Sequence, residues 1–242
     1  MARLDIIRSG EFVLRRQRLI AHLRHHGRQI GRPYHESVLL AMGNIPRERF
    51  MTPLTRTESY DDCAQPIRLG QTLSQPSMVA WMTTLLALTG VENVLEIGTG
   101  TGYQTLVLSK LVPHGCVVSV ERLPFLARHA RRRLRALGVR NVEVVIGDGS
   151  LGFAQHAPYD RILVTAGAPQ IPDPMLDQIA PGGCVVAPIG SHSMKELITL
   201  HASGNGDYAL VNHGRCSFVP LIGEHGWSDD HSDDLDHLPK QE

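Results

Sequence analysis

The chain has 242 residues, of which 42% are hydrophobic and 20% are charged, a composition typical of a globular protein with one main domain. Its 24 Lys and Arg residues balance its 24 Asp and Glu residues, so no net charge attracts the molecule to nucleic acid or to a membrane surface. No apolar run approaches the roughly 20 residues of a membrane span, and Met1 to Gly10 lack the apolar centre of a signal peptide. We therefore expect a cytoplasmic protein, in keeping with four cysteines that form no C-x-x-C pair.

The first third of the chain is expected to be mainly helical. Apolar residues recur at helical spacing between residues 11 and 50, with a second short helix expected at His35 to Met42. Residues 51 to 75 contain several Pro and Gly residues and are expected to be irregular. A long apolar helix is then expected at Ser77 to Leu88.

From Glu92 onward, short apolar strands alternate with helices. Strands are expected at 94–97, 116–120, 142–146, 161–165 and 183–189, and helices at 103–111, 124–137 and 174–179. This alternation predicts an α/β fold with a doubly wound, mostly parallel sheet covered by helices on both faces. The last two strands, near 197–201 and 208–218, have no long helix between them and are expected to pair as a hairpin at one sheet edge.

A glycine-rich loop runs from Glu96 through Gly98, Thr99, Gly100 and Gly102 to Tyr103, between a strand and a helix. Glycine lets the backbone turn sharply and approach a ligand, and a helix N-terminus offers unpaired N–H groups to an anion. The G-x-G-x-x-G pattern of dinucleotide-binding proteins requires a small residue where this chain has Tyr103. The loop instead fits the E-x-G-x-G-x-G pattern of enzymes that bind S-adenosyl-L-methionine, whose methionine carboxylate would be the anion.

Two acidic positions follow later strands and suit the same cofactor. Glu121 lies just after the second strand, where a carboxylate can accept hydrogen bonds from both ribose hydroxyls; the alternative is a surface Glu that caps the next turn. Asp148 and Gly149 follow the third strand, where the Asp can accept a hydrogen bond from the adenine amino group; the alternative is a plain turn.

Four further stretches resemble one family of methyltransferases. They are Gln65 to Ala80 with its T-L-S-Q-P core, the P-R-E-R-F stretch at 46–50, the segment 177–190 with its G-G and P-I-G elements, and the F-V-P-L stretch at 218–221. In this combination the chain closely resembles the protein-L-isoaspartate O-methyltransferases over roughly residues 15 to 227. There are small departures from the family pattern: Gly167 stands where Ala is common, and Ile179 and Ala180 replace the usual Leu and Lys or Arg.

The resemblance implies methyl transfer from S-adenosyl-L-methionine to the α-carboxylate of L-isoaspartyl residues in damaged proteins and peptides. It implies a catalytic role for Ser74, with Thr72 as the second candidate, because the family's Ser at that place is commonly treated as the active-site residue. Ser74 is alternatively an N-cap of the helix after Pro76. We expect residues 1–75 to form a helical, substrate-covering segment, 76–227 the cofactor-binding core, and 228–242 a disordered acidic, His-rich tail.

Two rival functions remain to be tested. The first is a methyltransferase acting on tRNA or a small molecule, supported only by arginine clusters at 15–32 and 128–135, which are more simply solvated helix faces. The second is a non-catalytic protein that keeps the cofactor fold as a scaffold. We expect a monomer with no nucleic-acid or membrane partner, and no metal, because the thirteen histidines lack the spacing of a ligand set.

Overall fold

The computed structural model describes residues 2–203 and 206–229 of the chain. Most of the expected tail, 228–242, lies outside the described residues. The helices are α1 (Ala2–Gln29), α2 (Glu36–Asn44), α3 (Pro76–Leu85), α4 (Tyr103–Leu111), α5 (Pro124–Ala136) and α6 (Asp173–Gln178). Short 3-10 helices include η1 (Arg47–Phe50), η2 (Arg56–Glu58), η3 (Gly149–Leu151) and η4 (Ala154–His156).

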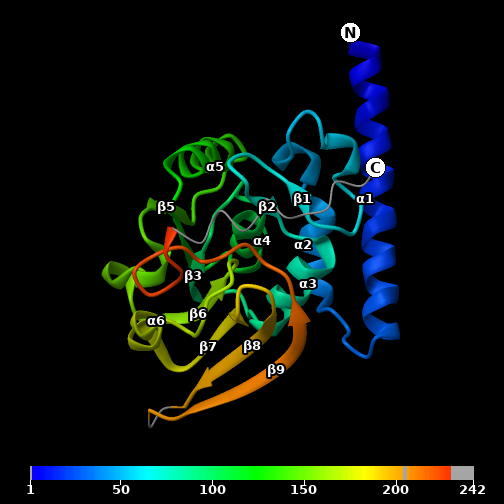
Figure 1. Cartoon of the computed structure of the whole chain (residues 1–242). Coiled ribbons are helices and arrows are strands. Elements are labelled where there is room, and N and C mark those ends of the chain that lie inside the picture. Colours follow the sequence, from blue (N-terminus) through cyan, green and yellow to red (C-terminus); the bar gives the residue numbers. More distant parts are fainter. Residues whose placement is uncertain (1, 204–205, 230–242) are drawn as a thin grey trace.

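Seven strands form one twisted sheet in the order β5-β4-β3-β6-β7-β8-β9 (Figure 1). Their bounds are β3 (Asn93–Ile97), β4 (Cys116–Glu121), β5 (Val142–Ile146), β6 (Tyr159–Val164), β7 (Ile179–Gly190), β8 (Lys195–Ala202) and β9 (Tyr208–Cys216). The first five strands of that order pair in parallel, and β7, β8 and β9 pair antiparallel. The predicted parallel sheet with an antiparallel hairpin at one edge is therefore confirmed. A separate two-stranded hairpin joins β1 (Gln65–Pro66) to β2 (Thr72–Leu73).

Alternate residues of each strand face opposite layers of the molecule. In β3, Leu95 and Ile97 belong to an apolar cluster that also contains Met175 of α6, whereas Val94 belongs to a cluster with Met82 of α3 and Leu108 of α4. Since side chains alternate across a strand, this pattern buries both faces of the sheet.

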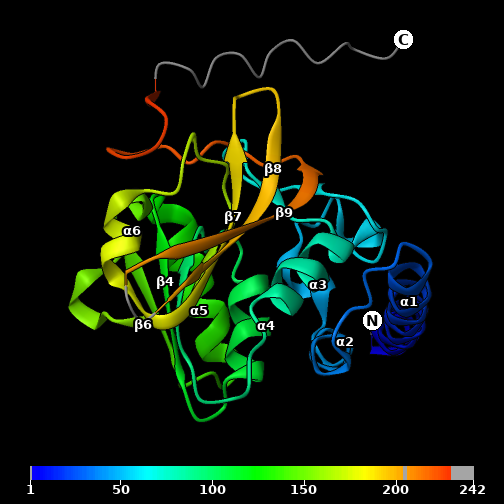
Figure 2. The same ribbon diagram turned by 90° about the horizontal axis from the view of Figure 1, so that it is seen from below.

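The N-terminal helices share a core with the sheet-covering helices. Leu23 of α1 and Leu39 of α2 are buried in one cluster with Val79 of α3, Leu106 of α4 and Leu134 of α5. Figure 2 shows α1 and α2 together at the end of the molecule next to α3. Packing of this kind stabilises helices far more than their own propensity does, so the N-terminal segment is built into the same fold as the core.

Several element bounds differ from the sequence-based expectation. The helix expected from residue 11 starts at Ala2 and ends at Gln29, and residues 32–35 are not helical before α2 begins. Helix α3 ends at Leu85 rather than Leu88, and Ala87 and Gly90 have positive φ, a conformation that cannot continue a right-handed helix. Strand β7 starts at Ile179 instead of 183 because Ile179 already pairs with Tyr159.

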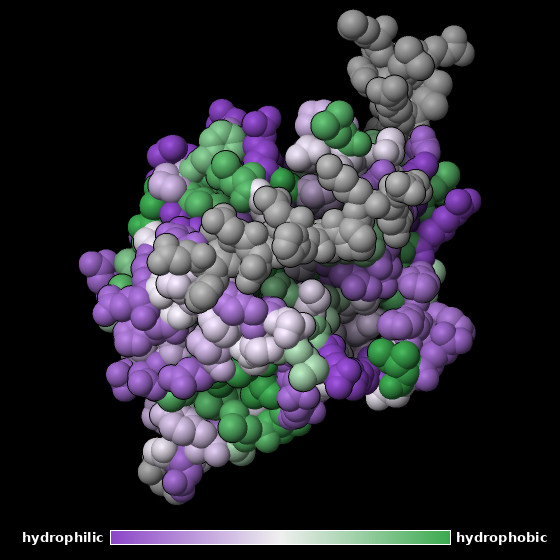
Figure 3. Space-filling view, viewed as in Figure 1, coloured by the Kyte–Doolittle hydropathy of each residue, from purple (hydrophilic) through white to green (hydrophobic). Residues whose placement is uncertain are grey.

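The face of the molecule seen in Figure 3 is mostly hydrophilic along the part of α1 that is coloured, and more hydrophobic at its lower end, over β8 and β9. Leu210 and Val211 of β9, the outermost strand, are 65% and 44% exposed. In the described part of the chain, no helix is both long enough and apolar enough to cross a membrane.

Helix α3 is capped by a side chain from a distant part of the sequence. Its N-cap residue is Gln75, which makes no side-chain capping bond, and the carboxylate of Asp62 instead accepts the backbone N–H of Ser77 at 2.8 Å. We expect Asp62→Ala to lower the free energy of unfolding by about 1 kcal/mol, the usual cost of losing a cap. Urea denaturation would measure the loss, with the neighbouring exposed Asp61→Ala as the matched control. Equal stability of the two variants would contradict the capping role.

Candidate active site

A cavity opens where β3, β4 and β6 end. Its walls come from the ends of β3 and β4, the loops after β3, β4, β5 and β6, the β1–β2 hairpin, the start of α5 and a C-terminal segment. The lining residues are Gly70, Gln71, Thr72, Ile97, Gly98, Gly100, Val120, Glu121, Arg122, Leu123, Leu126, Gly149, Thr165, Ala166, Val219, Pro220, Leu221 and Ile222. Strand β3 lies between β4 and β6. From β3 the chain runs outward through β4 and β5 on one side, and from β6 it continues outward on the other side. Ligands of open α/β sheets bind at such a point, beyond the carboxyl ends of the strands.

The glycine loop forms the floor of this cavity. Gly98 has φ +95°, and a Cβ placed on it would lie 2.3 Å from Oγ1 of Thr165. Gly100 also lines the cavity. Gly102 does not; it packs against α5, where a Cβ would lie 3.3 Å from that of Ala130. Two of the three loop glycines therefore line the cavity, and the third brings α4 close to α5.

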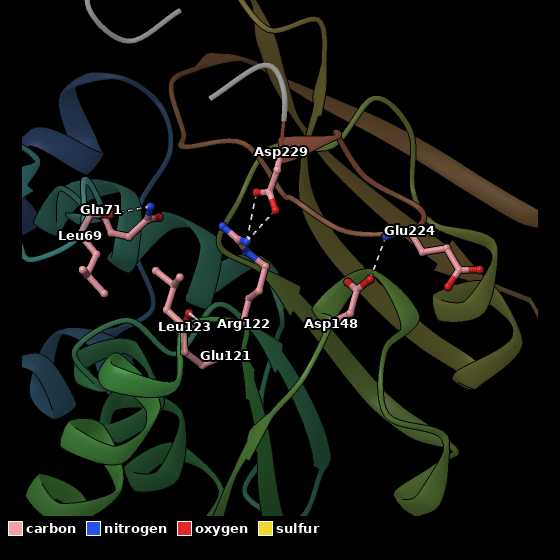
Figure 4. Close-up of polar contacts among 8 residues, drawn as sticks. All are labelled: Leu69, Gln71, Glu121, Arg122, Leu123, Asp148, Glu224 and Asp229. Carbon is pink, nitrogen blue, oxygen red and sulfur yellow. Dashed lines mark hydrogen bonds and ion pairs between the residues drawn. The ribbon is translucent and has the colours of Figure 1, made fainter. Parts of the chain in front are cut away.

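Glu121 joins the glycine loop to the start of α5. One carboxylate oxygen accepts the N–H of Gly100 at 2.8 Å, and the other accepts the N–H of Leu123 at 2.9 Å (Figure 4). The residue is 7% exposed and lines the cavity. A carboxylate has about four lone-pair positions, so both oxygens can still accept a hydroxyl hydrogen bond.

Glu96 and Thr99 lie beneath the loop rather than in the cavity wall. Glu96 is fully buried, and one of its oxygens accepts hydrogen bonds from the hydroxyls of Thr105 and Ser119, each at 2.5 Å. Oγ1 of Thr99 lies 2.6 Å from Oγ of Ser119. Burial raises the pKa of Glu96 to about 8, although its hydrogen bonds with Ser119 and Thr105 oppose the shift. This network ties the loop to β3, β4 and α4.

The raised pKa of Glu96 predicts a pH-dependent loss of stability. The buried carboxyl group prefers to be protonated, so its contribution is fully present below the ordinary pKa of 4.5 and is lost as the pH rises through about 8. Glu96→Gln cannot ionise and should therefore lose less unfolding free energy than the wild type between about pH 5 and about pH 8.5. Urea denaturation at both pH values would measure this difference, with exposed Glu58→Gln as control. Parallel profiles for wild type and Glu96→Gln would rule out Glu96 as the titrating group.

Asp148 is largely occupied by contacts within the protein. Its carboxylate accepts the N–H and hydroxyl of Ser150 and, through its other oxygen, the N–H of Glu224 at 2.8 Å (Figure 4). Burial opposes its ionisation, but these hydrogen bonds outweigh burial and lower its pKa. Its neighbour Gly149 lines the cavity, whereas Asp148 does not. In this structure Asp148 fixes the C-terminal segment beside the cavity.

The β1–β2 hairpin brings the T-L-S segment to the site. Leu69 and Gly70 both have positive φ, and the N–H of Gln71 donates to the carbonyl of Arg68, as in the type I′ turns that suit tight hairpins. Thr72 lines the cavity beyond this turn. Ser74 is half-buried outside the lining, with its carbonyl oxygen bound by Arg47 at 2.8 Å. Since Gln75 is the N-cap of α3, the alternative role of Ser74 as a helix cap is wrong.

The C-terminal segment and Arg122 complete the cavity. Val219, Pro220 and Leu221 of the F-V-P-L stretch line the cavity, and Ile222 lies in the same wall. Arg122 was missed, although it follows Glu121 directly. Its guanidinium pairs with Asp229 at 3.1 Å, which joins the end of the described chain to the start of α5 (Figure 4).

The described residues contain no group of three or more His, Cys, Asp or Glu side chains placed to hold a metal ion. The polar residues that line the cavity are instead the glycines of the loop, which offer backbone groups, and Glu121, Thr72, Thr165, Gln71 and Arg122. These groups suit an organic ligand with hydroxyl and carboxylate groups.

Known proteins similar to this chain point to one family. The family model for protein-L-isoaspartate(D-aspartate) O-methyltransferase matches residues 14–226. The protein-L-isoaspartate O-methyltransferase 2 of Pelobacter propionicus is 50% identical over 192 residues, covering 79% of this chain and 84% of the relative. The enzyme of the same name from Methanopyrus kandleri is 44% identical over 219 residues, covering 90% of this chain and 95% of the relative.

Solved structures agree with this grouping. A protein-L-isoaspartate O-methyltransferase matches with a TM-score of 0.77 and 31% identity, covering 87% of this chain and 67% of its own. A putative protein-L-isoaspartate O-methyltransferase from Plasmodium falciparum, solved with S-adenosyl-L-homocysteine, shares the fold with a TM-score of 0.71 at 20% identity, covering 83% of this chain and 97% of its own. The chain therefore belongs to the protein-L-isoaspartate(D-aspartate) O-methyltransferase family.

Proposed function

We propose that this chain repairs aged proteins by transferring a methyl group from S-adenosyl-L-methionine to the α-carboxylate of L-isoaspartyl residues. The observation that carries the proposal, together with family membership, is one cavity that holds both the glycine loop and Thr72 of the T-L-S segment. This shared cavity supports a cofactor site that adjoins Thr72 to Ser74, which we call the acceptor segment.

The residues of the cavity fit this cofactor. Gly98 lines the cavity with φ +95°, and a Cβ on it would clash with Oγ1 of Thr165, so only glycine keeps the loop backbone in the conformation that borders the ligand space. Glu121 offers its remaining lone pairs to the two ribose hydroxyls, and Val120, Leu123 and Leu126 offer apolar walls to a planar base. When bound, the cofactor supplies an electrophilic methyl group on a sulfonium sulfur.

The protein's task in the reaction is mainly to orient groups and exclude water. The substrate carboxylate is ionised at neutral pH and is itself the nucleophile, so no strong general base is required. A hydroxyl from Thr72 or Ser74 can donate to this carboxylate and fix its direction. The apolar wall formed by Val219, Leu221 and Ile222 excludes water from the space where the carboxylate must meet the methyl group.

The proposed function also suggests a role for each part of the chain. We propose that residues 1–75 cover the substrate and residues 76–227 bind the cofactor. We propose that the enzyme is a cytoplasmic monomer that acts on isoaspartyl proteins and peptides. Its zero net charge gives no general attraction to nucleic acid or to a membrane surface.

A transfer assay tests the proposed function directly. With labelled S-adenosyl-L-methionine, we expect methyl incorporation into an isoaspartyl peptide and none into its aspartyl twin or bulk tRNA. Label on tRNA would favour a nucleic-acid methyltransferase. Binding of S-adenosyl-L-homocysteine without label on any acceptor would favour a non-catalytic scaffold.

Cofactor affinity is expected to depend on Glu121. We expect Glu121→Ala to weaken S-adenosyl-L-homocysteine binding by about 1–3 kcal/mol, since a charged acceptor for the ribose hydroxyls is lost. Calorimetry would measure the change, with Glu143→Ala, an exposed acid of the neighbouring strand β5, as the matched control. Wild-type affinity in Glu121→Ala, or tighter binding of NAD than of S-adenosyl-L-homocysteine, would contradict the assignment.

A further inference from the structure

Arg47 is buried deep between the cofactor loop and the acceptor segment. It is 0% exposed, and its Nη1 has no hydrogen-bond partner among the described residues. Its guanidinium donates to the carbonyl oxygens of Ser59 at 2.9 Å and Ser74 at 2.8 Å. A buried charge that leaves one amino group unpaired is costly for stability, and this cost points to a role for Arg47 beyond packing.

One short helix places Arg47 and Phe50 on the same side. Both belong to η1, and residues three apart in a 3-10 helix lie one above the other. Between them lies Tyr103, the first residue of α4, immediately after the glycine loop. The Arg47 guanidinium carbon is 4.7 Å from the centre of the Tyr103 ring, and the Phe50 ring meets Tyr103 edge-on at 5.5 Å.

The stack continues to the other side of the loop. The guanidinium carbon of Arg133, from α5, lies 5.3 Å from the centre of the Phe50 ring. Its Nη1 donates to the carbonyl oxygen of Thr101 in the glycine loop at 2.6 Å. We call Arg47, Tyr103, Phe50 and Arg133 the Arg47–Arg133 stack. Its two ends hold Ser74 of the acceptor segment and Thr101 of the cofactor loop.

Each link in this stack is directional. Desolvated cation–π contacts and edge-on aromatic pairs depend on ring orientation, and charge-assisted hydrogen bonds depend on the donor's position. Any shift of the loop on ligand binding would therefore change the geometry that the stack imposes at Ser74. Tyr103, whose bulk excludes a dinucleotide pattern, contacts Arg47 and Phe50, and Arg133 joins the stack through Phe50.

We propose that the Arg47–Arg133 stack couples occupation of the cofactor site to binding of the methyl acceptor, with Arg47 as the positioning residue for the Thr72–Ser74 segment. The inference rests on the proposed function, because it concerns the same acceptor. The proposal gives the P-R-E-R-F stretch a role through Arg47 and Phe50, although neither residue lines the cavity. The two ends of the stack bind different carbonyl oxygens, Arg47 that of Ser74 and Arg133 that of Thr101.

The experiment measures coupling rather than activity alone. The affinity for an isoaspartyl peptide is determined without and with saturating S-adenosyl-L-homocysteine, and the ratio of the two dissociation constants is the coupling factor. For the wild type we expect tighter peptide binding in the presence of S-adenosyl-L-homocysteine, by about 5- to 150-fold, the usual range of coupling between sites. A wild-type ratio of one would overturn the proposal.

Variants at both ends of the stack locate the coupling. Arg133→Met keeps the aliphatic packing of a half-buried residue but removes the contact with Phe50 and Thr101. We expect it to bring the coupling factor close to one and to raise the peptide KM, with little change in kcat. Arg128→Met, on the exposed side of the same helix, is the matched control and should keep the wild-type factor.

Arg47→Lys and Phe50→Leu extend the test to the other members. Lys keeps the charge but not the planar fork that reaches two carbonyl groups, so the coupling factor should fall as in Arg133→Met. If either variant fails to fold, Arg133→Met still decides. A wild-type coupling factor in Arg133→Met, in an enzyme that methylates isoaspartyl peptide, would overturn this inference and leave the proposed function intact.

Discussion

Gly98→Ala is expected to abolish useful cofactor binding. The residue has φ +95°, which L side chains rarely adopt, and its new Cβ would lie 2.3 Å from Oγ1 of Thr165. Thr165 cannot easily move away, because its hydroxyl lies 2.8 Å from the carbonyl oxygens of both Ile97 and Gly98. Backbone strain of about 1–3 kcal/mol combined with this clash should weaken S-adenosyl-L-homocysteine binding by roughly 100-fold or more.

Two further variants separate the causes of that loss. Gly138 also has positive φ, but a Cβ added there would meet no atom within 4 Å. Gly138→Ala should therefore lose stability from backbone strain while keeping its affinity for S-adenosyl-L-homocysteine. Adding Thr165→Ala to Gly98→Ala removes the clash and should restore part of the affinity. Calorimetry and thermal melting measure both effects. If Gly98→Ala bound S-adenosyl-L-homocysteine as the wild type does, the loop would not be in close contact with the cofactor.

The fold was predictable from the sequence because its signals are local. Apolar strands end in glycine or acidic loops, and helical periodicity follows each of them, so the alternation and the edge hairpin could be inferred without tertiary information. The helix bounds were predicted less accurately. Helix α3 ends just before Ala87, which has positive φ, and an Ala in the sequence does not signal that conformation. The early start of β7 depends on pairing with Tyr159, which lies far away in the sequence.

The candidate site was predictable as a set of motifs, but not in its division of roles. Gly98, Gly100, Glu121, Gly149 and Thr72 line one cavity. The sequence could not show which carboxylates form hydrogen bonds within the protein rather than with a ligand, because their partners are far away in the sequence. Glu96 binds Ser119 in the next strand, and Asp148 binds the backbone of Glu224 in the C-terminal segment. Their roles as direct cofactor ligands therefore stay predictions.

The acceptor side carries the second prediction with a large effect. We expect Ser74→Ala to lower kcat/KM for an isoaspartyl peptide by about 10- to 1000-fold, because an orienting hydrogen bond contributes less than a nucleophile would. Affinity for S-adenosyl-L-homocysteine should stay close to wild type. Because Ser74 does not cap α3, its replacement should change the free energy of unfolding by less than about 0.5 kcal/mol. Initial rates and thermal melting of this one variant measure all three quantities.

Thr72 provides the matched comparison for Ser74. In β2, Leu73 is buried in the apolar core whereas Thr72 is exposed in the cavity wall. Thr72→Val keeps the shape of the side chain and removes only the hydroxyl group. If Ser74 orients the substrate carboxylate, Thr72→Val should retain most of the wild-type kcat/KM while Ser74→Ala loses it. Wild-type kinetics in Ser74→Ala together with a large loss in Thr72→Val would move the orienting hydroxyl to Thr72, the residue that the structure places in the cavity.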